Sequence, residues 1–339
     1  MIPRTIPSCQ SDEPNSVTTD WQLALAQAFR EPAELLDYLN LPQSLYAKKA
    51  NNDFALRAPR GFCARIEKGN PDDPLLKQIL PISNELADDI GFSVDPVGDL
   101  AAVEAPGLLH KYHGRVLLVT TPVCAIHCRY CFRRHFPYQE NRAEQDWLQA
   151  MDYIRLNSDI HEVILSGGDP LSLSDNKLKN ITDKLTSIPH IKTLRIHTRQ
   201  PIVLPERINT SFLNWIASLP WKVVMVVHCN HANEIDTHVA HALQQLQQHD
   251  ILLLNQSVLL AGVNDNVASL AALSEKLFEH HVLPYYLHLL DKVKGAKHFD
   301  VDVIQAKKIM AELRSQLPGY LVPKLVQENH GESSKTVVF

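Results

Sequence analysis

Short apolar runs alternate with longer amphipathic stretches over most of the chain, and this alternation restricts the possible folds more than any other feature. Six runs have the length and composition of buried strands, at 116–120, 162–166, 194–198, 222–228, 251–257 and 283–289. A helical stretch follows each of them, near 144–157, 175–187, 206–218, 235–248, 267–280 and 301–317. Strands and helices that alternate in this way form parallel sheets with crossover helices. Six units are fewer than the eight of a closed barrel, so the pattern predicts an open, partial (β/α)6 barrel of the α/β class.

The first hundred residues have a different character, because prolines and glycines interrupt short helical segments. Residues 1–17 are polar and contain three prolines, which predicts an irregular arm. Thr19 or Asp20 is expected to cap a helix from Trp21 to about Arg30, and Pro32 to open a second helix through Leu39. Further helical pieces are expected at 73–80 and 83–89. We therefore predict a mostly helical N-terminal subdomain over 1–105 that wraps around a barrel domain over 106–339.

Composition excludes several classes of function. A chain of 339 residues that is 45% hydrophobic can bury a sizeable core. Its net charge is −5 and no basic stripe is interleaved with aromatic residues, so we expect no nucleic-acid groove. The first residues lack the apolar core of a signal peptide, and no apolar run approaches the roughly 20 residues that a membrane span needs. We expect a cytoplasmic protein without a membrane segment.

Half of the six cysteines lie in one loop, directly after the first predicted strand. Cys124, Cys128 and Cys131 have the spacing C-x3-C-x2-C, and the loop would lie at the carboxyl end of the strand, where barrel folds place their active sites. Clustered cysteines in a cytoplasmic protein favour metal binding over disulfides. The remaining three, Cys9, Cys63 and Cys229, are scattered, and we interpret them as free thiols.

Three thiolates leave the identity of the metal open. A structural zinc ion is normally four-coordinate and would need His127 or His135 as a fourth ligand. A four-iron cluster that is held by three cysteines instead keeps one iron free for a substrate or cofactor. Structural zinc or ordinary core cysteines remain alternatives on the spacing alone.

Polar side chains follow the later predicted strands, at the edge where the cysteine loop is expected. The segments are His197-Thr-Arg199, His228-Cys-Asn230-His231, Asn255-Gln256-Ser257 and His288-Leu-Leu-Asp291. A single histidine in such a position is more often structural than a ligand. Four strand ends that converge at one edge predict a site.

Two local patterns together resemble the radical S-adenosylmethionine (SAM) superfamily. Tyr130 immediately precedes the third cysteine, and the second predicted strand ends in Ser166-Gly167-Gly168-Asp169-Pro170. In that superfamily the C-x3-C-x2-C loop holds a [4Fe–4S] cluster, and the amino and carboxylate groups of SAM chelate the open iron. The resemblance implies that Tyr130 packs near the adenine. It also implies that the turn of Gly167, Gly168 and Asp169 binds the methionine amino group.

The last residues contain Gly331-Glu-Ser-Ser-Lys335-Thr, which by itself would be an ordinary solvated tail. The string lacks the second glycine of a phosphate-binding loop, so we reject that interpretation. From about residue 54 onward, however, the chain resembles the lysine 2,3-aminomutase family, which combines radical SAM chemistry with pyridoxal phosphate (PLP). The segments that carry the resemblance are Lys111–Arg115, Cys124–Arg134, Gly167–Leu171, Arg199–Pro205, His228–His231, Asn255–Leu260 and Pro284–Asp291.

The resemblance implies roles for individual residues. Lys335 would be the catalytic lysine that forms the Schiff base with PLP, while Tyr112 and Arg115 would hold the PLP phosphate. His228 and Gln256 would belong to the cofactor-binding set. Arg133 would bind the substrate carboxylate, and the remaining two positions, Asp291 and Glu328, would receive the distal ammonium group.

Departures from the longer bacterial members favour a short branch of the family. Lys111 stands where the long branch has an arginine, and His288 where it has a tyrosine. The chain stops four residues after Lys335, without a zinc-binding extension, and Gly-Glu-Ser-Ser replaces the glycine run before that lysine. The short branch modifies bacterial elongation factor P together with a lysyl-tRNA-synthetase-like ligase.

The expected activity is therefore that of an isomerase that converts L-α-lysine to β-lysine, with SAM, PLP and an external electron donor. One alternative is an aminomutase for another amino acid such as glutamate, although Asp291 and Glu328 favour a cationic substrate. An alternative from another class is a zinc-stabilised binding module.

Overall fold

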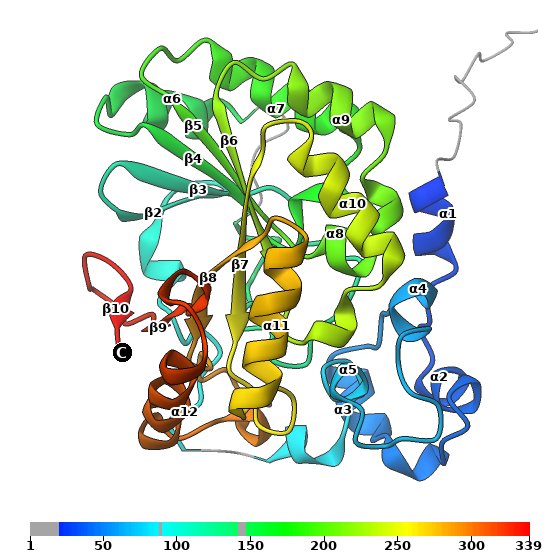
Figure 1. Ribbon diagram of the computed structural model, residues 1–339. Coiled ribbons are helices and arrows are strands. Elements are labelled where there is room, and N and C mark those ends of the chain that lie inside the picture. The colour runs from blue at the N-terminus through cyan, green and yellow to red at the C-terminus, as the bar shows by residue number, and fades with distance from the viewer. Residues whose placement is uncertain (1–19, 88–89, 142–146) are drawn as a thin grey trace, which may run out of the picture.

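A single ten-stranded sheet dominates the computed structural model, which describes residues 20–87, 90–141 and 147–339 (Figure 1). The strands follow one another across the sheet in chain order, from β1 to β10. Their bounds are β1 Val103–Ala105, β2 Leu108–Tyr112, β3 Arg115–Val119, β4 Glu162–Ser166, β5 Thr193–Thr198, β6 Lys222–His228, β7 Leu252–Val258, β8 Leu283–His288, β9 Lys324–Gln327 and β10 Thr336–Val337. Because β1 and β10 form two separate edges, the barrel is open.

The six predicted strands correspond to β3–β8, and each pairs in parallel with its neighbour. The prediction of six parallel strands was incomplete, however, because β9 adds a seventh parallel strand beside β8. The four residues of β9 include only Leu325 and Val326 as apolar residues, too few for a recognisable strand pattern. The edges are antiparallel, with β1 and β2 before β3 and with β10 after β9.

Helices connect the parallel strands and cover the outer face of the sheet (Figure 1). The α-helices are α1 Asp20–Ala26, α2 Pro32–Tyr38, α3 Lys48–Asp53, α4 Arg60–Cys63, α5 Pro74–Lys77, α6 Leu148–Leu156, α7 Asp175–Thr186, α8 Gln200–Val203, α9 Thr210–Ala217, α10 Thr237–Gln247, α11 Val267–Glu279 and α12 Val303–Gln316. The 3-10 turns are η1 Gln43–Leu45, η2 Ser83–Leu86, η3 Leu100–Ala102, η4 Pro170–Ser172, η5 Pro205–Arg207, η6 Ala232–Glu234, η7 Lys297–Phe299 and η8 Gly319–Leu321. The crossover helices are α6, α7, α9, α10, α11 and α12.

Side-chain caps fix where several crossover helices begin. Asn209 accepts a hydrogen bond from Phe212 N at 3.0 Å, so α9 begins at Thr210 and not near 206 as predicted. Asp236 caps α10 in the same way through Val239 N. Capping residues of this type satisfy backbone N–H groups that the first helical turn leaves unpaired.

The N-terminal region consists of the short helices α1–α5. The first helix ends at Ala26 and not near Arg30, because the backbone of Phe29 forms a two-way bridge with Ala58 at 2.8 and 3.0 Å. The second helix begins at Pro32 as predicted, and η2 replaces the expected helix that starts at Ser83. The predictions for the arm at 1–17, for a cap at Thr19 and for Cys9 lie outside the described residues, as do parts of the helices expected at 83–89 and 144–157.

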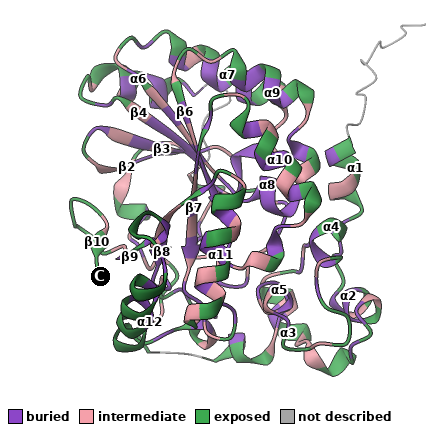
Figure 2. Ribbon diagram, viewed as in Figure 1, coloured by how far each residue is buried: buried purple, intermediate pink, exposed green. Residues whose placement is uncertain are grey.

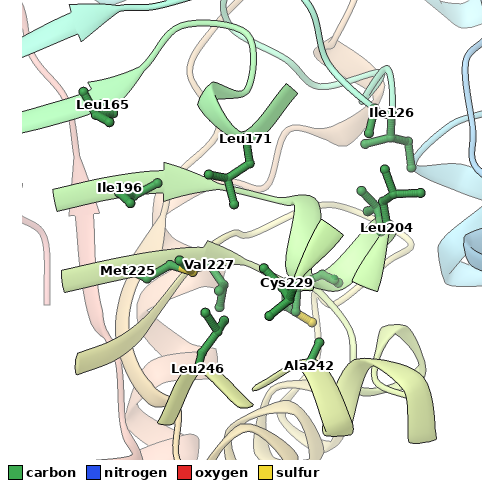
Figure 3. Close-up of a cluster of buried hydrophobic side chains, with 14 of the residues drawn as sticks. Ile126, Leu165, Leu171, Ile196, Leu204, Met225, Val227, Cys229, Ala242 and Leu246 are labelled. Atoms are coloured by element: carbon green, nitrogen blue, oxygen red, sulfur yellow. The ribbon is translucent and has the colours of Figure 1, made fainter. Parts of the chain in front are cut away.

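The main hydrophobic core lies between the outer face of the sheet and its helices (Figure 2). Figure 3 shows Met225 and Val227 of β6 packed toward Ala242 and Leu246 of α10. Alternate strand residues point to opposite faces, so Val226 and His228 of the same strand point to the inner face. The strands therefore carry apolar side chains outward and a mixed, more polar set inward.

The sheet begins within the segment that we assigned to the N-terminal subdomain, since β1 already pairs with β2. The boundary between 105 and 106 stays a prediction. Among the described residues, no helix has both the length and the apolar character that crossing a membrane would require.

Candidate active site

The ends of β5–β8 bring four predicted strand-end segments to the inner face of the barrel. His228 pairs in register with Gln256, and Val258 pairs with His288. His288 in turn pairs with Val326 of β9, just before Glu328. Neighbouring residues of parallel strands carry their side chains on the same face, so these polar groups form one layer at the carboxyl edge of the sheet.

The cysteine loop follows β3 and lies against this edge. Cys128 Sγ accepts a hydrogen bond from the guanidinium of Arg199 at 2.8 Å. Burial raises the pKa of Cys124 well above its ordinary value, and Cys131, Asp169 and Cys128 raise it further. Burial and Cys128 likewise raise the pKa of Cys131 to about 11. Cys124 and Cys131 would therefore have to lose protons on binding a metal, and nearby arginines favour their charged forms.

Each of the two histidines that could complete a zinc site has one ring nitrogen in contact with a backbone carbonyl. His127 Nδ1 lies 2.7 Å from the carbonyl of Ala55, and its ring stacks on Phe54. His135 Nε2 lies 3.3 Å from the carbonyl of Lys294. Within the described ranges, no three cysteine, histidine or acidic side chains surround a point that a single metal ion could occupy. A four-iron cluster that is held by three cysteines needs no histidine, because it keeps one iron open.

The Gly167-Gly168 turn holds the cysteine loop against the end of β4. Gly168 N donates to the carbonyl of Thr121 at 2.6 Å. A Cβ atom on Gly168 would lie 2.7 Å from the carbonyl oxygen of Val123, and one on Gly167 would lie 2.8 Å from that of Thr121. Gly167 also has a φ of +124°. Glycine is therefore required at both positions for the two backbones to approach.

Asp169 connects this turn to the end of β5. Its carboxylate accepts hydrogen bonds from Leu171 N, Thr198 Oγ1 and Arg199 N at 2.7 to 3.0 Å. Burial raises its pKa to about 6. These contacts are structural, whereas the contact to methionine that the superfamily implies for Gly167, Gly168 and Asp169 stays a prediction.

Tyr130 lies at the centre of a buried polar network. Its hydroxyl accepts hydrogen bonds from Arg199 at 2.8 Å and Asn230 at 2.7 Å, and its ring stacks on His228 with centroids 5.7 Å apart. Burial and Arg199 lower the pKa of His228 to about 3, so this imidazole is neutral at physiological pH. The network therefore fixes the orientation of the Tyr130 ring within the cysteine loop.

The same network contains two residues that sequence reasoning missed. Arg199 Nη2 donates to Gln78 Oε1 at 2.7 Å and to Glu234 Oε2 at 2.8 Å. Gln78 belongs to the N-terminal region, where no local pattern marked it. Glu234 follows the recognised His228–His231 segment by three residues, so its proximity to a candidate site was the only available signal.

A second group of charged side chains surrounds Lys335. Lys335 Nζ lies 2.5 Å from Glu328 Oε2, and Lys111 Nζ lies 2.9 Å from Glu328 Oε1. Burial raises the pKa of Glu328, but the two lysines outweigh this effect and lower the pKa to about 2. Lys111 also forms an ion pair with Asp99 at 2.6 Å. Both carboxylate oxygens of Glu328 therefore have cationic partners within the protein, which differs from the free distal-ammonium acceptor that the family resemblance implies.

Asp99 extends this chain of charges to Arg133. Arg133 Nε donates to Asp99 Oδ2 at 2.7 Å, and its Nη1 donates to Ser166 Oγ at 3.1 Å. Asp99 is a further residue that the sequence did not indicate, because it lies in a loop of mixed composition. Gly98 has a φ of +66°, and a Cβ there would lie 2.0 Å from the His330 ring, so glycine lets this loop reach the C-terminal segment.

Three more predicted residues lie around the same charges. Burial raises the pKa of Asp291 to about 7, against the opposing effect of Lys335. Burial and Glu328 raise the pKa of Tyr112. The guanidinium of Arg115 lies over the Tyr112 ring, 4.8 Å from its centroid. The structure thus brings Tyr112, Arg115, Asp291, Glu328 and Lys335 into one neighbourhood.

The radical SAM superfamily model matches residues 118–210, which contain the cysteine loop and the Gly-Gly turn. Together with the open parallel barrel and its three thiols, this match defines a radical SAM enzyme.

Similar proteins of known function show to which family of radical SAM enzymes the chain belongs. L-lysine 2,3-aminomutase of Escherichia coli (strain K12) is 49% identical over 321 residues, which are 94% of each chain. The Haemophilus influenzae enzyme of the same name is 49% identical over 94% of this chain and 95% of its own. The Clostridium subterminale enzyme is 36% identical over 94% of this chain and 77% of its own. The chain belongs to the L-lysine 2,3-aminomutase family of isomerases. Radical SAM enzymes use a [4Fe–4S] cluster and SAM, and lysine 2,3-aminomutases also depend on PLP.

Proposed function

We propose that this protein interconverts L-α-lysine and β-lysine by a PLP-assisted 1,2-amino shift. The observation that carries the proposal is the chain of ion pairs from Lys335 through Glu328, Lys111 and Asp99 to Arg133. It connects the candidate PLP lysine with an arginine two residues after Cys131. Two cofactors that must act on one substrate need such proximity, because a radical reaction depends on the positioning of its partners.

The residues present fit the cofactors of the family. We assign the [4Fe–4S] cluster to Cys124, Cys128 and Cys131, and PLP to Lys335. SAM would lie beside Tyr130 and the turn of Gly167, Gly168 and Asp169, while Tyr112, Arg115, His228 and Gln256 complete the cofactor-binding set. When bound, the cluster and SAM supply a hydrogen-abstracting radical, and PLP holds the amino group that migrates.

The chain itself contributes binding, orientation and exclusion of water. Arg133 has five N–H donors, of which Asp99 and Ser166 engage two nitrogens, so donors remain for the substrate carboxylate. Asp291, which is half-buried and whose pKa is affected by Lys335, is suited to a lysine ammonium group once it is ionised. Glu328 would join it only if its pairs with Lys111 and Lys335 rearrange.

We further propose that the β-lysine serves the modification of bacterial elongation factor P by a lysyl-tRNA-synthetase-like ligase. Support comes from sequence similarity, since the chain is 49% identical to the Escherichia coli and Haemophilus influenzae relatives and 36% identical to the Clostridium one. Incubating purified factor and ligase with the reaction product, and measuring the mass of the factor, tests this step.

The activity is tested in anaerobic reactions with free lysine, SAM, PLP and a reductant, with mass spectrometry and chromatography of the products. Formation of β-lysine is the expected result. Lysine that remains unchanged while SAM is cleaved and glutamate is converted would overturn the substrate assignment. Zinc without sulfide in the purified protein would overturn the whole proposal.

Lys335→Ala is predicted to abolish β-lysine formation and the absorbance of lysine-bound PLP, while iron and sulfide contents stay at parental level. The reason is that the two cofactors are held by different segments. Lys324→Ala is a matched control, because Lys324 is exposed on β9. Borohydride reduction and peptide mapping should label Lys335, and label on another lysine would contradict the assignment.

A further inference from the structure

His197 of β5 carries a buried polar atom without a partner. Its Nε2 is shielded from solvent and forms no hydrogen bond with any described residue. Buried side-chain nitrogens in folded proteins nearly always have a partner, and leaving one unpaired costs stability. An unpaired nitrogen at a candidate site is therefore a reason to look for a ligand that completes it.

The position of His197 in the sheet defines what lies around it. Leu165 of β4 pairs with Ile196, which places the next residues, Ser166 and His197, beside each other. Leu165 and Ile196 pack into the outer core, so Ser166 and His197 point to the inner face (Figure 3). Arg133 donates to the hydroxyl of Ser166 at 3.1 Å. His197 is thus next to the contact that holds Arg133.

The surroundings of His197 make its ring a neutral hydrogen-bond donor. Burial lowers the pKa of His197 well below its ordinary value, and the cations Arg195, Lys335 and Arg133 lower it further. The ring is therefore neutral, and with its proton on Nε2 it acts as a hydrogen-bond donor. Each of these cations also pairs with a carboxylate, of Glu162, Glu328 and Asp99 respectively, so an oxygen anion would be held here by hydrogen bonds from His197 and from the remaining N–H groups of Arg133.

A carboxylate bound at Arg133 could accept a further hydrogen bond from a second residue. Its Nε is bonded to Asp99 and its Nη1 to Ser166. Arginine binds a carboxylate most strongly when two nitrogens on one edge of the guanidinium donate two parallel hydrogen bonds. One edge of Arg133 contains Nε and the other contains Nη1, so each edge already has one nitrogen that donates to the protein. A carboxylate at Arg133 would gain from an additional donor on the neighbouring strand.

We propose that His197 Nε2–H donates a hydrogen bond to the α-carboxylate of the amino-acid substrate and thereby shares its recognition with Arg133. This inference rests on the proposed function and deepens it by assigning a substrate-binding residue. PLP also carries anionic oxygens, on its phenolate and its phosphate, which the experiment must separate from the carboxylate, and SAM is left out of the titration.

The test is a binding titration of the holoenzyme, loaded with cluster and PLP but without SAM, under anaerobic conditions. Lysine and cadaverine, which is lysine without its carboxylate, are titrated while PLP absorbance is followed. For His197→Ala we expect the affinity for lysine to fall by at least about tenfold, because a hydrogen bond to a charged group is lost. Cadaverine should bind within about twofold of parental affinity. His197→Gln, which can still donate, should bind lysine more tightly than the alanine variant does.

The controls keep the inference separable from other failures. His190→Ala removes a histidine whose Nε2 already bonds the Ile154 carbonyl, and it should change neither affinity. Equal loss for both ligands, or no loss for either, would overturn the proposal. A shift in the pH dependence of PLP absorbance without ligand would instead assign the bond to the phenolate. If the alanine variant fails to load its cofactors, His197→Leu, which also lacks a donor but fills more of the space, provides the same comparison.

Failure of the proposed function would be visible in the parental protein alone. If that protein forms β-lysine but His197→Ala does not distinguish lysine from cadaverine, only this inference is wrong. If it acts on glutamate instead, the titration is repeated with glutamate and 4-aminobutyrate, the product of removing its α-carboxylate. A loss of affinity for glutamate but not for 4-aminobutyrate would support the role of His197 in binding the carboxylate. The assignment of lysine as the substrate would then be wrong.

Discussion

Individual side chains at this site are defined by the charges next to them. Cys128 lies against Arg199, Glu328 lies between two lysines, and Asp291 is half-buried with Lys335 nearby. For Glu328 and Asp291 these surroundings shift the pKa in opposite directions, down for Glu328 and up for Asp291. Two predictions follow from particular residues.

Cys128→Ala is predicted to remove the [4Fe–4S] cluster and SAM cleavage together, because two thiolates cannot replace three cluster ligands. Iron and sulfide analysis and the release of methionine from SAM measure the two effects. Cys63→Ala is the control, since Cys63 is buried in the main core and not in the cysteine loop. Full iron and sulfide in the Cys128 variant would contradict the ligand assignment.

Asp291 makes the binding of lysine depend on pH. Its pKa in the ligand-free protein is about 7, and only the ionised form attracts an ammonium group. Lysine should therefore bind about tenfold more weakly at pH 6 than at pH 8, as expected when a group must lose its proton first. Norleucine, which lacks the distal amine, should show no such dependence. A parallel pH dependence for both ligands would rule out this role for Asp291.

The raised pKa also affects folding. Between about pH 4 and pH 7 the folded protein holds a proton on Asp291 that the unfolded chain releases, so this group lowers stability as pH rises through that window. Binding of a cationic substrate offsets that cost.

Elements meet at this site through close backbone contacts as well as through side chains. The end of β4 touches the cysteine loop only because Gly167 and Gly168 lack Cβ atoms. The loop before β1 reaches the segment after β9 through Gly98, which lets Asp99 approach Lys111 and Arg133. The geometry of the site therefore depends on how loops from different strands pack.

Gly168→Ala is predicted to reduce iron and sulfide contents several-fold, because the new methyl group would lie 2.7 Å from the backbone of the cysteine loop. Backbone atoms cannot move aside as a flexible side chain can, so the loop itself would shift. Gly319→Ala is a matched control, since no atom lies within 4 Å of the Cβ position there. Parental cluster content in the Gly168 variant would show that the loop tolerates the displacement.

On the scale of the whole molecule, the N-terminal region and the barrel share buried polar contacts. Gln78 accepts from Arg199 and Asn230 and donates to Glu234. Arg129, which is fully buried, forms an ion pair with Glu85 and donates to the carbonyl of Phe54. The N-terminal region is therefore part of the support of the cysteine loop.

Gln78→Leu is predicted to destabilise the apoprotein by about 3 kcal/mol, because it leaves buried charged and polar groups of the barrel without partners. Thermal unfolding measured with and without the cluster tests this, and the loss should appear in both states. Gln43→Leu removes an exposed hydrogen bond to Asp37 and should change stability by less than about 0.5 kcal/mol. Equal effects of the two substitutions would mean that the buried network contributes little.

The sequence determined the parallel strands β3–β8, their crossover helices and the C-x3-C-x2-C loop, because periodicity and spacing are local properties of the chain. It also indicated Lys335 and Asp291 through resemblance to a family. It did not reveal β9, whose four residues are too few to show a pattern. The end of α1 was likewise misplaced, because a backbone bridge to Ala58 overrides the helical preference of the segment.

Only the tertiary structure decided which side chains face one another across long stretches of chain. Lys111 and Glu328 are separated by 217 positions, yet they form one ion pair, and Asp99 joins them from a loop without any recognisable motif. The unpaired Nε2 of His197 is equally invisible in the sequence, since it depends on which residues surround one buried atom. Partners, burial and pKa values arise from packing between distant segments, and no local pattern contains that information.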